Sequence, residues 1–261
     1  MMRLYIFSMF MLSVLVFLFL LEVPSFAPPT NSSCPVNMIK VGSVCIDRYE
    51  ASVWSLPPSG GSPRGTQYGT NEIDNYPCSD NGNDCSGANP IFAALLPGVT
   101  PSADITWFQA QQACFNVGKR LPTNAEWQGA AAGTPTDYEP GADDGVDDCN
   151  TSTATTVVPT GSRSNCVSNY GVFDMVGNLA EWVADWIQHN LDIDEGNVTT
   201  ALYGMDAVFK IDEAPPVTDR FPAALIRGGD FSRETDAGVF MLDASNSPST
   251  SRFDIGSRCA R

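Results

Sequence analysis

The most restrictive feature of this sequence is a set of eight cysteines in 261 residues. They follow an N-terminal segment typical of exported proteins and stand at Cys34, Cys45, Cys78, Cys85, Cys114, Cys149, Cys166 and Cys259. An even number of cysteines in an exported chain predicts a disulfide framework, here of four bridges. A zinc site would instead need CxxC-type pairs or histidines, and the chain has one histidine, His189. Four disulfides and no zinc are therefore expected, with many connectivities still open.

Residues 1–27 resemble an export signal. Arg3 precedes a long apolar stretch, Leu4–Leu21, and the small-residue site Ser25–Ala27 follows it. The stretch is longer than most signal cores, and Pro28 disfavours cleavage after Ala27, so an uncleaved membrane anchor is the alternative. Either interpretation places the rest of the chain, residues 28–261, outside the cytoplasm.

The charge of the chain excludes one class of partner. Its formal net charge is -16 and its sequence pI is near 4.2, so it would repel phosphate backbones. A nucleic-acid partner is therefore not expected. The hydrophobic content of 43% is ordinary for a globular domain and predicts a real core.

Two helices are predicted from their capping boxes. Thr106 and Gln109 form the first capping box, and Gly118 ends this helix, whose apolar face is Trp107, Ala110, Cys114 and Val117. Thr123 and Glu126 form the second, and that helix continues to Gly133. Little else in the chain is strongly helical.

The rest of the chain predicts short strands among long loops. Ser55–Thr70 is too rich in proline and glycine for a helix or a central strand, so it is expected to be a surface loop. Gly141–Asn150 carries four aspartates without the spacing of an EF-hand and is expected to be a solvated acidic loop. Apolar pieces such as Leu225–Ile226 predict brief strands. The expected fold class is thus α+β, rich in loops and held by disulfides.

Four segments together resemble the sulfatase-modifying-factor, or formylglycine-generating-enzyme-like, family. They are Trp107–Trp127, Tyr170–Trp186, Arg227–Gly229 and the terminal Gly256–Ala260. The resemblance runs from about Cys34 to Arg261. It implies one C-type-lectin-like domain with two main helices and short antiparallel strands, although a fold by itself does not fix a function.

The resemblance also implies one disulfide. In that family a helix cysteine is bonded to the cysteine of the terminal motif, which corresponds here to Cys114 with Cys259. Proximity in the sequence then favours three further pairs, Cys34 with Cys45, Cys78 with Cys85, and Cys149 with Cys166, while other pairings stay open.

The family's catalytic residues are not matched in this chain. Formylglycine-generating enzymes carry two active-site cysteines shortly after the Arg-Gly-Gly motif, where thiolates bind copper and activate oxygen. The corresponding positions here are near Arg233 and Gly238. The sulfoxide-forming branch uses several iron-binding histidines, and His189 alone is expected to have a surface or packing role. No catalytic residue is therefore predicted.

The family often holds calcium through the segment that contains Asp174, Gly177, Leu179 and Glu181. Two carboxylates and two carbonyl groups around a glycine bend would supply the hard oxygen ligands that calcium prefers. The alternative is that Glu181 only caps or pairs nearby while Trp182 and Trp186 pack the segment. A second family site would involve Asn150, although its usual acidic partner is not evident downstream. Structural calcium is the predicted cofactor.

The last segment, residues 230–258, is expected to bind the ligand. It resembles the variable region of proteins that are diversified by retroelements, in which polar positions change on a fixed scaffold. The predicted variable positions are Ser232, Arg233, Asp236, Asp243, Ser245, Asn246, Thr250, Arg252 and Asp254, and Asp230 and Phe253 complete the predicted ligand-binding set. The alternative is that these residues are solvated turns of a degenerate enzyme.

The sequence thus predicts an exported, non-catalytic module that binds an unknown protein or glycan at the cell surface or outside the cell. The first alternative is an oxidoreductase of the formylglycine-generating type that acts on protein cysteine. A structural envelope protein that reuses the scaffold is the other alternative. A reactive thiol would distinguish the oxidoreductase from the binding module.

Overall fold

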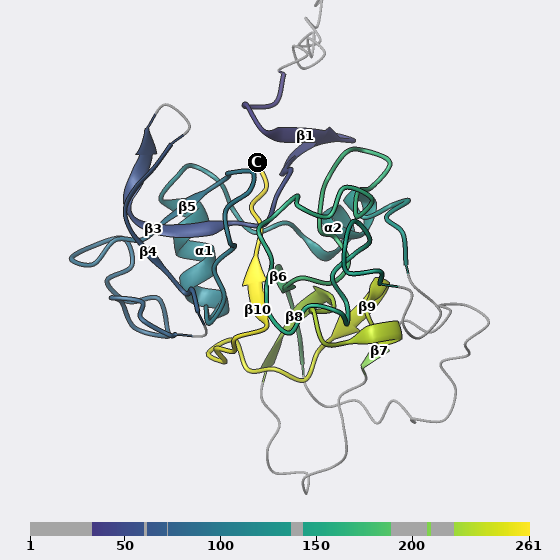
Figure 1. Ribbon diagram of the computed structural model, residues 1–261. Coiled ribbons are helices and arrows are strands. Elements are labelled where there is room, and N and C mark those ends of the chain that lie inside the picture. The colour runs from purple at the N-terminus through teal and green to yellow at the C-terminus, as the bar shows by residue number, and fades with distance from the viewer. Residues whose placement is uncertain (1–32, 60–61, 72, 137–142, 189–207, 210–221) are drawn as a thin grey trace, which may run out of the picture. The chain divides into compact units, whose positions relative to one another are not determined.

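The computed structural model describes residues 33–59, 62–71, 73–136, 143–188, 208–209 and 222–261 (Figure 1). The predicted signal or anchor, residues 1–27, and His189 lie outside these ranges. Within the described ranges, no helix is long and apolar enough to cross a membrane.

The strands form three small sheets. A two-stranded antiparallel sheet pairs β1 (Met38–Val41) with β2 (Val44–Asp47). A three-stranded sheet has the order β4-β3-β5, from β3 (Ser52–Ser59), β4 (Ser62–Tyr68) and β5 (Phe92–Ala94). A five-stranded sheet has the order β10-β6-β8-β9-β7, from β6 (Ala180–Gln188), β7 (Val208–Phe209), β8 (Pro222–Gly228), β9 (Gly238–Asp243) and β10 (Ile255–Ser257). A single 3₁₀ turn, η1 (Glu234–Asp236), lies between β8 and β9.

Both predicted helices are present, and both capping boxes are formed. Helix α1 spans Trp107–Phe115, and the side chains of Thr106 and Gln109 each accept a backbone N–H of the other residue. Helix α2 spans Asn124–Ala130, with the same reciprocal bonds between Thr123 and Glu126. These bonds satisfy amides that a helix start would otherwise leave unpaired. Both helices end before the predicted glycines.

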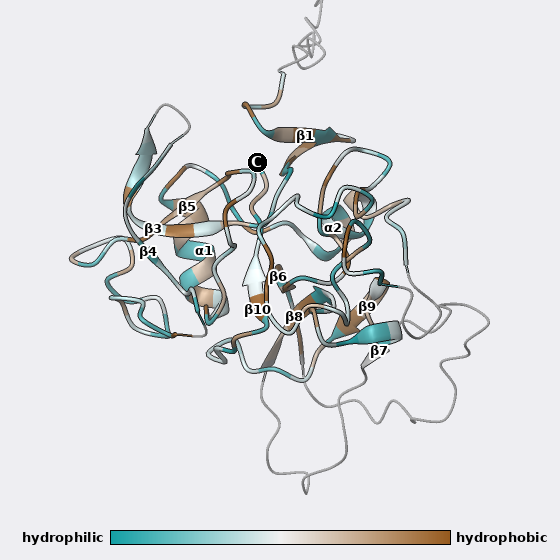
Figure 2. Cartoon of the chain, in the orientation of Figure 1, coloured by the Kyte–Doolittle hydropathy of each residue, from teal (hydrophilic) through white to brown (hydrophobic). Residues whose placement is uncertain are grey.

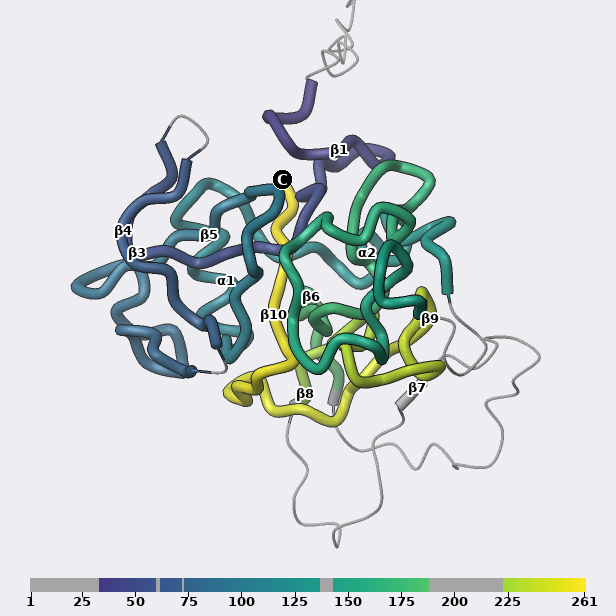
Figure 3. The backbone as a smooth tube through the Cα atoms, in the orientation of Figure 1, coloured from purple at the N-terminus to yellow at the C-terminus, as the bar shows by residue number. Residues whose placement is uncertain are grey.

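The C-terminal strand joins the parts of the domain. β10 runs parallel to β6, and in Figures 1 and 3 it passes between the blue elements around α1 and the green elements around β6. The residues after it bond to the N-terminal hairpin, because Asp47 donates its N–H to the carbonyl of Cys259 and Cys45 donates to Arg261. Arg120 and Ala260 exchange backbone bonds in the same way. The chain end is therefore part of the core framework.

Two clusters of buried apolar side chains form most of the core. Trp182 belongs to the cluster that packs α1 against β3, β5 and β6, and Trp127 belongs to the cluster around α2 and β8. Both tryptophans are fully buried. Figure 2 shows hydrophobic stretches on β3 and β9, whereas the outer part of β4 is more hydrophilic.

The prediction of a surface loop over Ser55–Thr70 is wrong, because Ser55–Ser59 form the outer part of β3 and Ser62–Tyr68 form β4. β5 pairs only with Ser52, Val53 and Trp54 of β3. Pro57 and Pro58 therefore lie where β3 has one neighbour, along a ladder with two register shifts. Proline is tolerated at such edges and bulges because no second ladder needs its missing N–H.

All four disulfides join the expected partners. They are Cys34–Cys45, Cys78–Cys85, Cys114–Cys259 and Cys149–Cys166. No cysteine of the chain is left free. Four disulfides indicate an oxidising, extracellular environment.

We predict that the four disulfides contribute unequally to stability. Cys114–Cys259 closes a separation of 145 residues and Cys78–Cys85 one of 7. Since loop-closure entropy grows with the loop, replacing the first pair by alanine should cost about 5 kcal/mol and replacing the second about 2 kcal/mol. Urea unfolding of the two double variants checks this order, and equal losses would contradict it.

Candidate functional site

The predicted ligand-binding segment begins at a backbone bend that requires glycine. Gly228, the last residue of β8, and Gly229, which follows it, have φ of 87° and 78°. A Cβ on Gly229 would lie 2.8 Å from both Cα and Cβ of Ala237, which is too close. The bend directs the chain away from β8 into the loop that contains η1.

Two turns with the same pattern hold this segment. Asp230 accepts the N–H and the hydroxyl of Ser232 on Oδ1. Asp243 accepts the N–H and the hydroxyl of Ser245 in the same way. The second oxygen of each aspartate accepts a hydrogen bond from the side chain three residues later in the sequence. Arg233 donates to Oδ2 of Asp230, and Asn246 donates to Oδ2 of Asp243. The repeated Asp-x-Ser pattern therefore builds a matching turn on each side of β9.

These contacts correct part of the predicted ligand-binding set. Asp230 is 1% exposed, Asp243 5% and Asp254 3%, so they do not present their side chains to a ligand. Asp254 is ion-paired with Arg252. Burial, together with the charge of Asp230, raises the pKa of Asp254 although Arg252 opposes the shift. A polar residue in a turn can be an internal hydrogen-bond acceptor, and the sequence alone did not separate the two roles.

The remaining predicted contact residues have accessible side chains. Phe253 is 45% exposed, and its ring lies 6.0 Å from that of the buried Phe231. Ser232 and Asp236 are also exposed, whereas Arg233, Ser245, Asn246, Thr250 and Arg252 are half-buried. The segment thus offers one supported aromatic ring among polar groups that the turns hold in place.

An aromatic cluster that the sequence analysis did not identify adjoins the segment. The ring of Trp186, from β6, lies 4.9 Å from that of Trp107 and 5.6 Å from that of Phe108. Trp186 is 38% exposed. The backbone N–H of Trp107 donates to the carbonyl of Pro248, which brings the cluster next to the polar turn after β9. Trp107 and Phe108 are neighbours in the first turn of α1, whereas Trp186 is far from them in the sequence. The cluster therefore becomes visible only when β6 packs beside α1 in the fold.

A buried group of charges lies beneath β10. Arg258 and Glu181 are both fully buried, and their side chains form an ion pair. Oε1 of Glu181 accepts from Nε and Nη2 of Arg258, and Oε2 accepts from Nε of Arg258 and from Nε1 of Trp127. Two more buried carboxyl groups, Glu50 and Asp174, interact electrostatically with this pair.

The excess of carboxylates changes their protonation. Burial, with the charges of Asp174 and Glu181, raises the pKa of Glu50 well above its ordinary value, although Arg258 opposes the shift. Burial likewise raises the pKa of Asp174 to about 6, against hydrogen bonds from Gly161 and Thr160. Arg258 is therefore the positive charge that interacts with three buried carboxyl groups, those of Glu181, Glu50 and Asp174.

Comparison with known proteins identifies the family. The profile of the sulfatase-modifying factor enzyme 1-like domain matches residues 88–261, more than half of the chain. The chain belongs to this family. It is 28% identical over 190 residues to the formylglycine-generating enzyme of Thermomonospora curvata, a match that covers 61% of this chain and 55% of that enzyme. It is 30% identical over 167 residues to the serine/threonine-protein kinase pkn1 of Chlamydia pneumoniae, covering 62% of this chain and 24% of the kinase.

Solved structures support the fold. The Major Tropism Determinant U1 variant superposes with a TM-score of 0.50 at 22% identity, covering 88% of this chain and 53% of that one. The I1 variant has the same TM-score at 20% identity. The predicted α+β, C-type-lectin-like fold is confirmed. The chain spans about a quarter of the pkn1 relative and about half of the enzyme relative.

The residues at the family's predicted cysteine positions have other roles here. Arg233 donates from Nε to Asp230, and Gly238, which is buried, pairs with Gly228 at the start of β9. Every cysteine of the chain is in a disulfide. Cys259, the cysteine nearest in sequence, is fully buried and bonded to Cys114.

The predicted calcium ligands fit an ion poorly. Each oxygen of Glu181 already accepts two donors, so Glu181 is not available as a calcium ligand. Its alternative role, pairing with a neighbouring group, is the one observed. Oδ2 of Asp174 accepts from Thr160 and Gly161. The carbonyl groups of Gly177 and Leu179 stay predicted calcium ligands.

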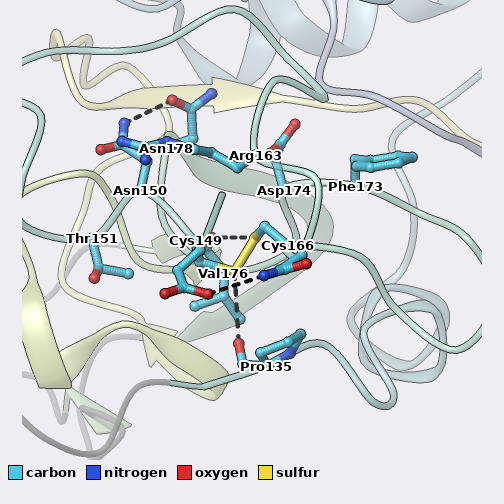
Figure 4. Close-up of a disulfide and its surroundings, with 12 residues drawn as sticks. Pro135, Cys149, Asn150, Thr151, Arg163, Cys166, Phe173, Asp174, Val176 and Asn178 are labelled. Carbon is cyan, nitrogen blue, oxygen red and sulfur yellow. Dashed lines mark hydrogen bonds between the residues drawn. A yellow bond between two sulfur atoms is a disulfide. The ribbon is translucent and has the colours of Figure 1, made fainter. Parts of the chain in front are cut away.

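Asn150 lies beside the Cys149–Cys166 disulfide, next to Asn178 (Figure 4). Its carbonyl accepts the N–H of Asn178 at 2.7 Å, and its Nδ2 donates to Oδ1 of Asn178 at 3.0 Å. In the described part of the chain, its buried Oδ1 accepts no hydrogen bond. One amide oxygen without a neighbouring acidic ligand is not a calcium cage. The observed role of Asn150 is to join the disulfide loop to the Gly177–Asn178 bend.

The acidic loop is only partly solvated, which corrects the prediction for Gly141–Asn150. Asp143 is 2% exposed and accepts backbone N–H groups from Gly145, Thr151, Ser152 and Thr153. Burial alone would raise its pKa, but these bonds outweigh it and lower the pKa to about 2. Asp144, Asp147 and Asp148 lie close together nearby, and one oxygen of Asp144 accepts backbone donors from its own turn.

We predict that Asp143 stabilises the fold in a pH-dependent way. Because its pKa is lowered on folding, its contribution is present above the unfolded value of 3.8 and is lost as the pH falls through about 2. Asp143→Asn should therefore cost about 2 kcal/mol at neutral pH and progressively less in acid. Urea unfolding of both proteins across this range measures the difference, and a constant difference would contradict the assignment.

We also predict that two aspartates of the ligand-binding segment differ sharply. Asp230→Ala removes three hydrogen bonds and leaves Arg233 without this carboxylate, so it should lower the free energy of unfolding by about 2 to 3 kcal/mol. Asp236→Ala, the same change at an exposed position, should alter it by less than about 0.5 kcal/mol. Thermal or urea unfolding compares the two, and similar losses would show that the turn is not part of the framework.

Proposed function

We propose that the chain is an exported, non-catalytic recognition module whose ligand contacts the accessible side chains of residues 230–258. The observation that carries this proposal is that all eight cysteines are in disulfides. The positions predicted for the family's thiolates, near Arg233 and Gly238, hold no cysteine. Oxidation of a substrate cysteine in this family depends on a thiolate at the site. A domain that keeps the disulfide-held fold but lacks the thiolate still has a surface on which a ligand can bind.

The design of the surface supports recognition. Asp230 and Asp243 fix the turns from inside, so exposed residues that do not bond to them, such as Asp236 and Phe253, can change without loss of the framework. Arg252 and Phe253 provide a charged group and a supported aromatic ring, and the Trp186 cluster lies beside the polar turn. Rigid aromatic anchors next to serine and asparagine side chains are typical of adaptable binding surfaces. The proposed partner is a protein or glycan outside the cell.

The same surface suits a diversified segment. Under this part of the proposal, Asp236 and Thr250 are the predicted variable positions that can change freely, because their side chains do not hold the turns. Ser232, Arg233, Ser245, Asn246 and Arg252 donate to buried aspartates, so change there is limited to residues that keep a donor. Asp243 and Asp254 stay fixed because they are buried. Sequencing the genomic region tests it. A reverse-transcriptase gene with a near-copy of the tail-coding DNA is the expected result, and its absence would reject diversification without affecting binding.

The test of binding compares two surface variants. The secreted protein is applied to arrays of glycans and of extracellular proteins, beside the double variant Thr250→Ala with Phe253→Ser, which leaves the Arg252–Asp254 ion pair intact. The matched control is Phe115→Ser, which changes an aromatic ring that is 64% exposed at the far end of α1. A ligand bound by the wild type and the control, and lost by the double variant, is expected. A ligand that all three bind equally would place recognition elsewhere.

The oxidoreductase alternative has its own assay. The oxidised protein is incubated with copper, oxygen, a thiol reductant and a peptide that carries the cysteine motif of a sulfatase, and the aldehyde product is followed by mass spectrometry. No product above the no-protein control is expected. Catalytic turnover would overturn the proposal.

A further inference from the structure

In the buried charge group, the guanidinium of Arg258 lies where oxygen atoms of the predicted calcium segment converge. The guanidinium of Arg258 is surrounded by oxygen atoms from separate parts of the chain. Nη2 donates to the carbonyl groups of Phe173 at 2.9 Å and Asp174 at 3.1 Å, and Nη1 donates to that of Asp47 at 3.2 Å. With both oxygens of Glu181, five oxygen atoms contact one organic cation.

Three of these five oxygens belong to the segment in which calcium was expected, namely both carboxylate oxygens of Glu181 and the carbonyl of Asp174. Glu181 was predicted as a ligand through this carboxylate, whereas the carboxylate predicted for Asp174 accepts from Thr160 and Gly161. A calcium ion requires six to eight oxygen ligands whose lone pairs point at it. Here the oxygens of Glu181 and the carbonyl of Asp174 point at Arg258 instead.

We infer that Arg258 is the internal cation of this segment: its guanidinium takes the place that a metal ion would occupy between Glu181 and the carbonyl of Asp174. The Asp174–Glu181 bend is thus held by the C-terminal strand rather than by calcium. Arg258 lies between the end of β10 and Cys259, so the disulfide to Cys114 fixes the position of this cation.

Glu50 provides acceptors for two further polar groups of the bend. Glu50 accepts the N–H of Leu179 on Oε1 and the Nδ2 of Asn178 on Oε2. These contacts orient the backbone at Asn178, which has a φ of 58°. A left-handed residue that is not glycine persists only where its surroundings hold it, and here Glu50 and Asn150 do so.

The test measures melting midpoints of the full exported chain in chelator and in millimolar calcium, for the wild type, Arg258→Met and Arg120→Met. Arg120 forms an ion pair with Glu126 and its side chain is 41% exposed, so it is a matched surface control. For the wild type, the melting midpoint in chelator should equal the midpoint in calcium, and the same should hold for Arg120→Met. Arg258→Met should melt about 10 °C lower in chelator, because Glu181 is left buried and unpaired. Calcium should recover part of this loss, because it can then reach the uncovered oxygens.

A calcium-dependent rise in the wild-type midpoint that Glu181→Gln abolishes would overturn the inference. An Arg258→Met variant that folds and gains nothing from calcium would also overturn it. If Arg258→Met does not fold, calorimetric titration of the wild type and Glu181→Gln with calcium decides. Binding that Glu181→Gln removes contradicts the inference, and no binding, or binding that this change leaves intact, supports it.

Discussion

The ion pair between Arg258 and Glu181 is the contact on which the rest of this domain depends. It joins the last strand of the chain to β6, and Arg258 reaches back from there to the carbonyl of Asp47 beside the N-terminal hairpin. A buried ion pair is strongly destabilising when one partner is removed, because the other charge stays in a region of low dielectric. The neighbouring Cys114–Cys259 bond keeps the two charges together by tying the same strand to α1.

This framework explains how the C-terminal segment can be both structural and exposed. Its two ends are fixed, at Gly228–Gly229 by a bend that excludes side chains and at β10 by backbone pairing with β6. Between these points, Asp230 and Asp243 hold the turns from the inside. The outer residues then carry little of the stability, which is the physical condition for a surface that changes its ligand without changing its fold.

The sequence predicted the local features well. The capping boxes of Thr106 and Thr123 form because their partners lie three residues away, and the disulfide partners followed from family resemblance and proximity. Features that depend on long-range packing were missed. Pro57 and Pro58 argued against a strand, but β3 is unpaired on that side. Arg258 among small and apolar residues was a signal of a buried, paired arginine. Its contact with Glu181 depends on the parallel pairing of β10 with β6, which places Gly256 opposite Glu181.

The measurement that tests the central claim most directly is a count of free thiols in the exported, oxidised protein, by alkylation and mass spectrometry, with the disulfide map from the same digest. The account predicts no free thiol and a Cys114–Cys259 linkage. A protein with both would have the framework for recognition and no sulfur for oxidative catalysis. A reactive free cysteine, above all Cys259, would contradict the account, because it would break the framework and restore the chemistry that the binding proposal excludes.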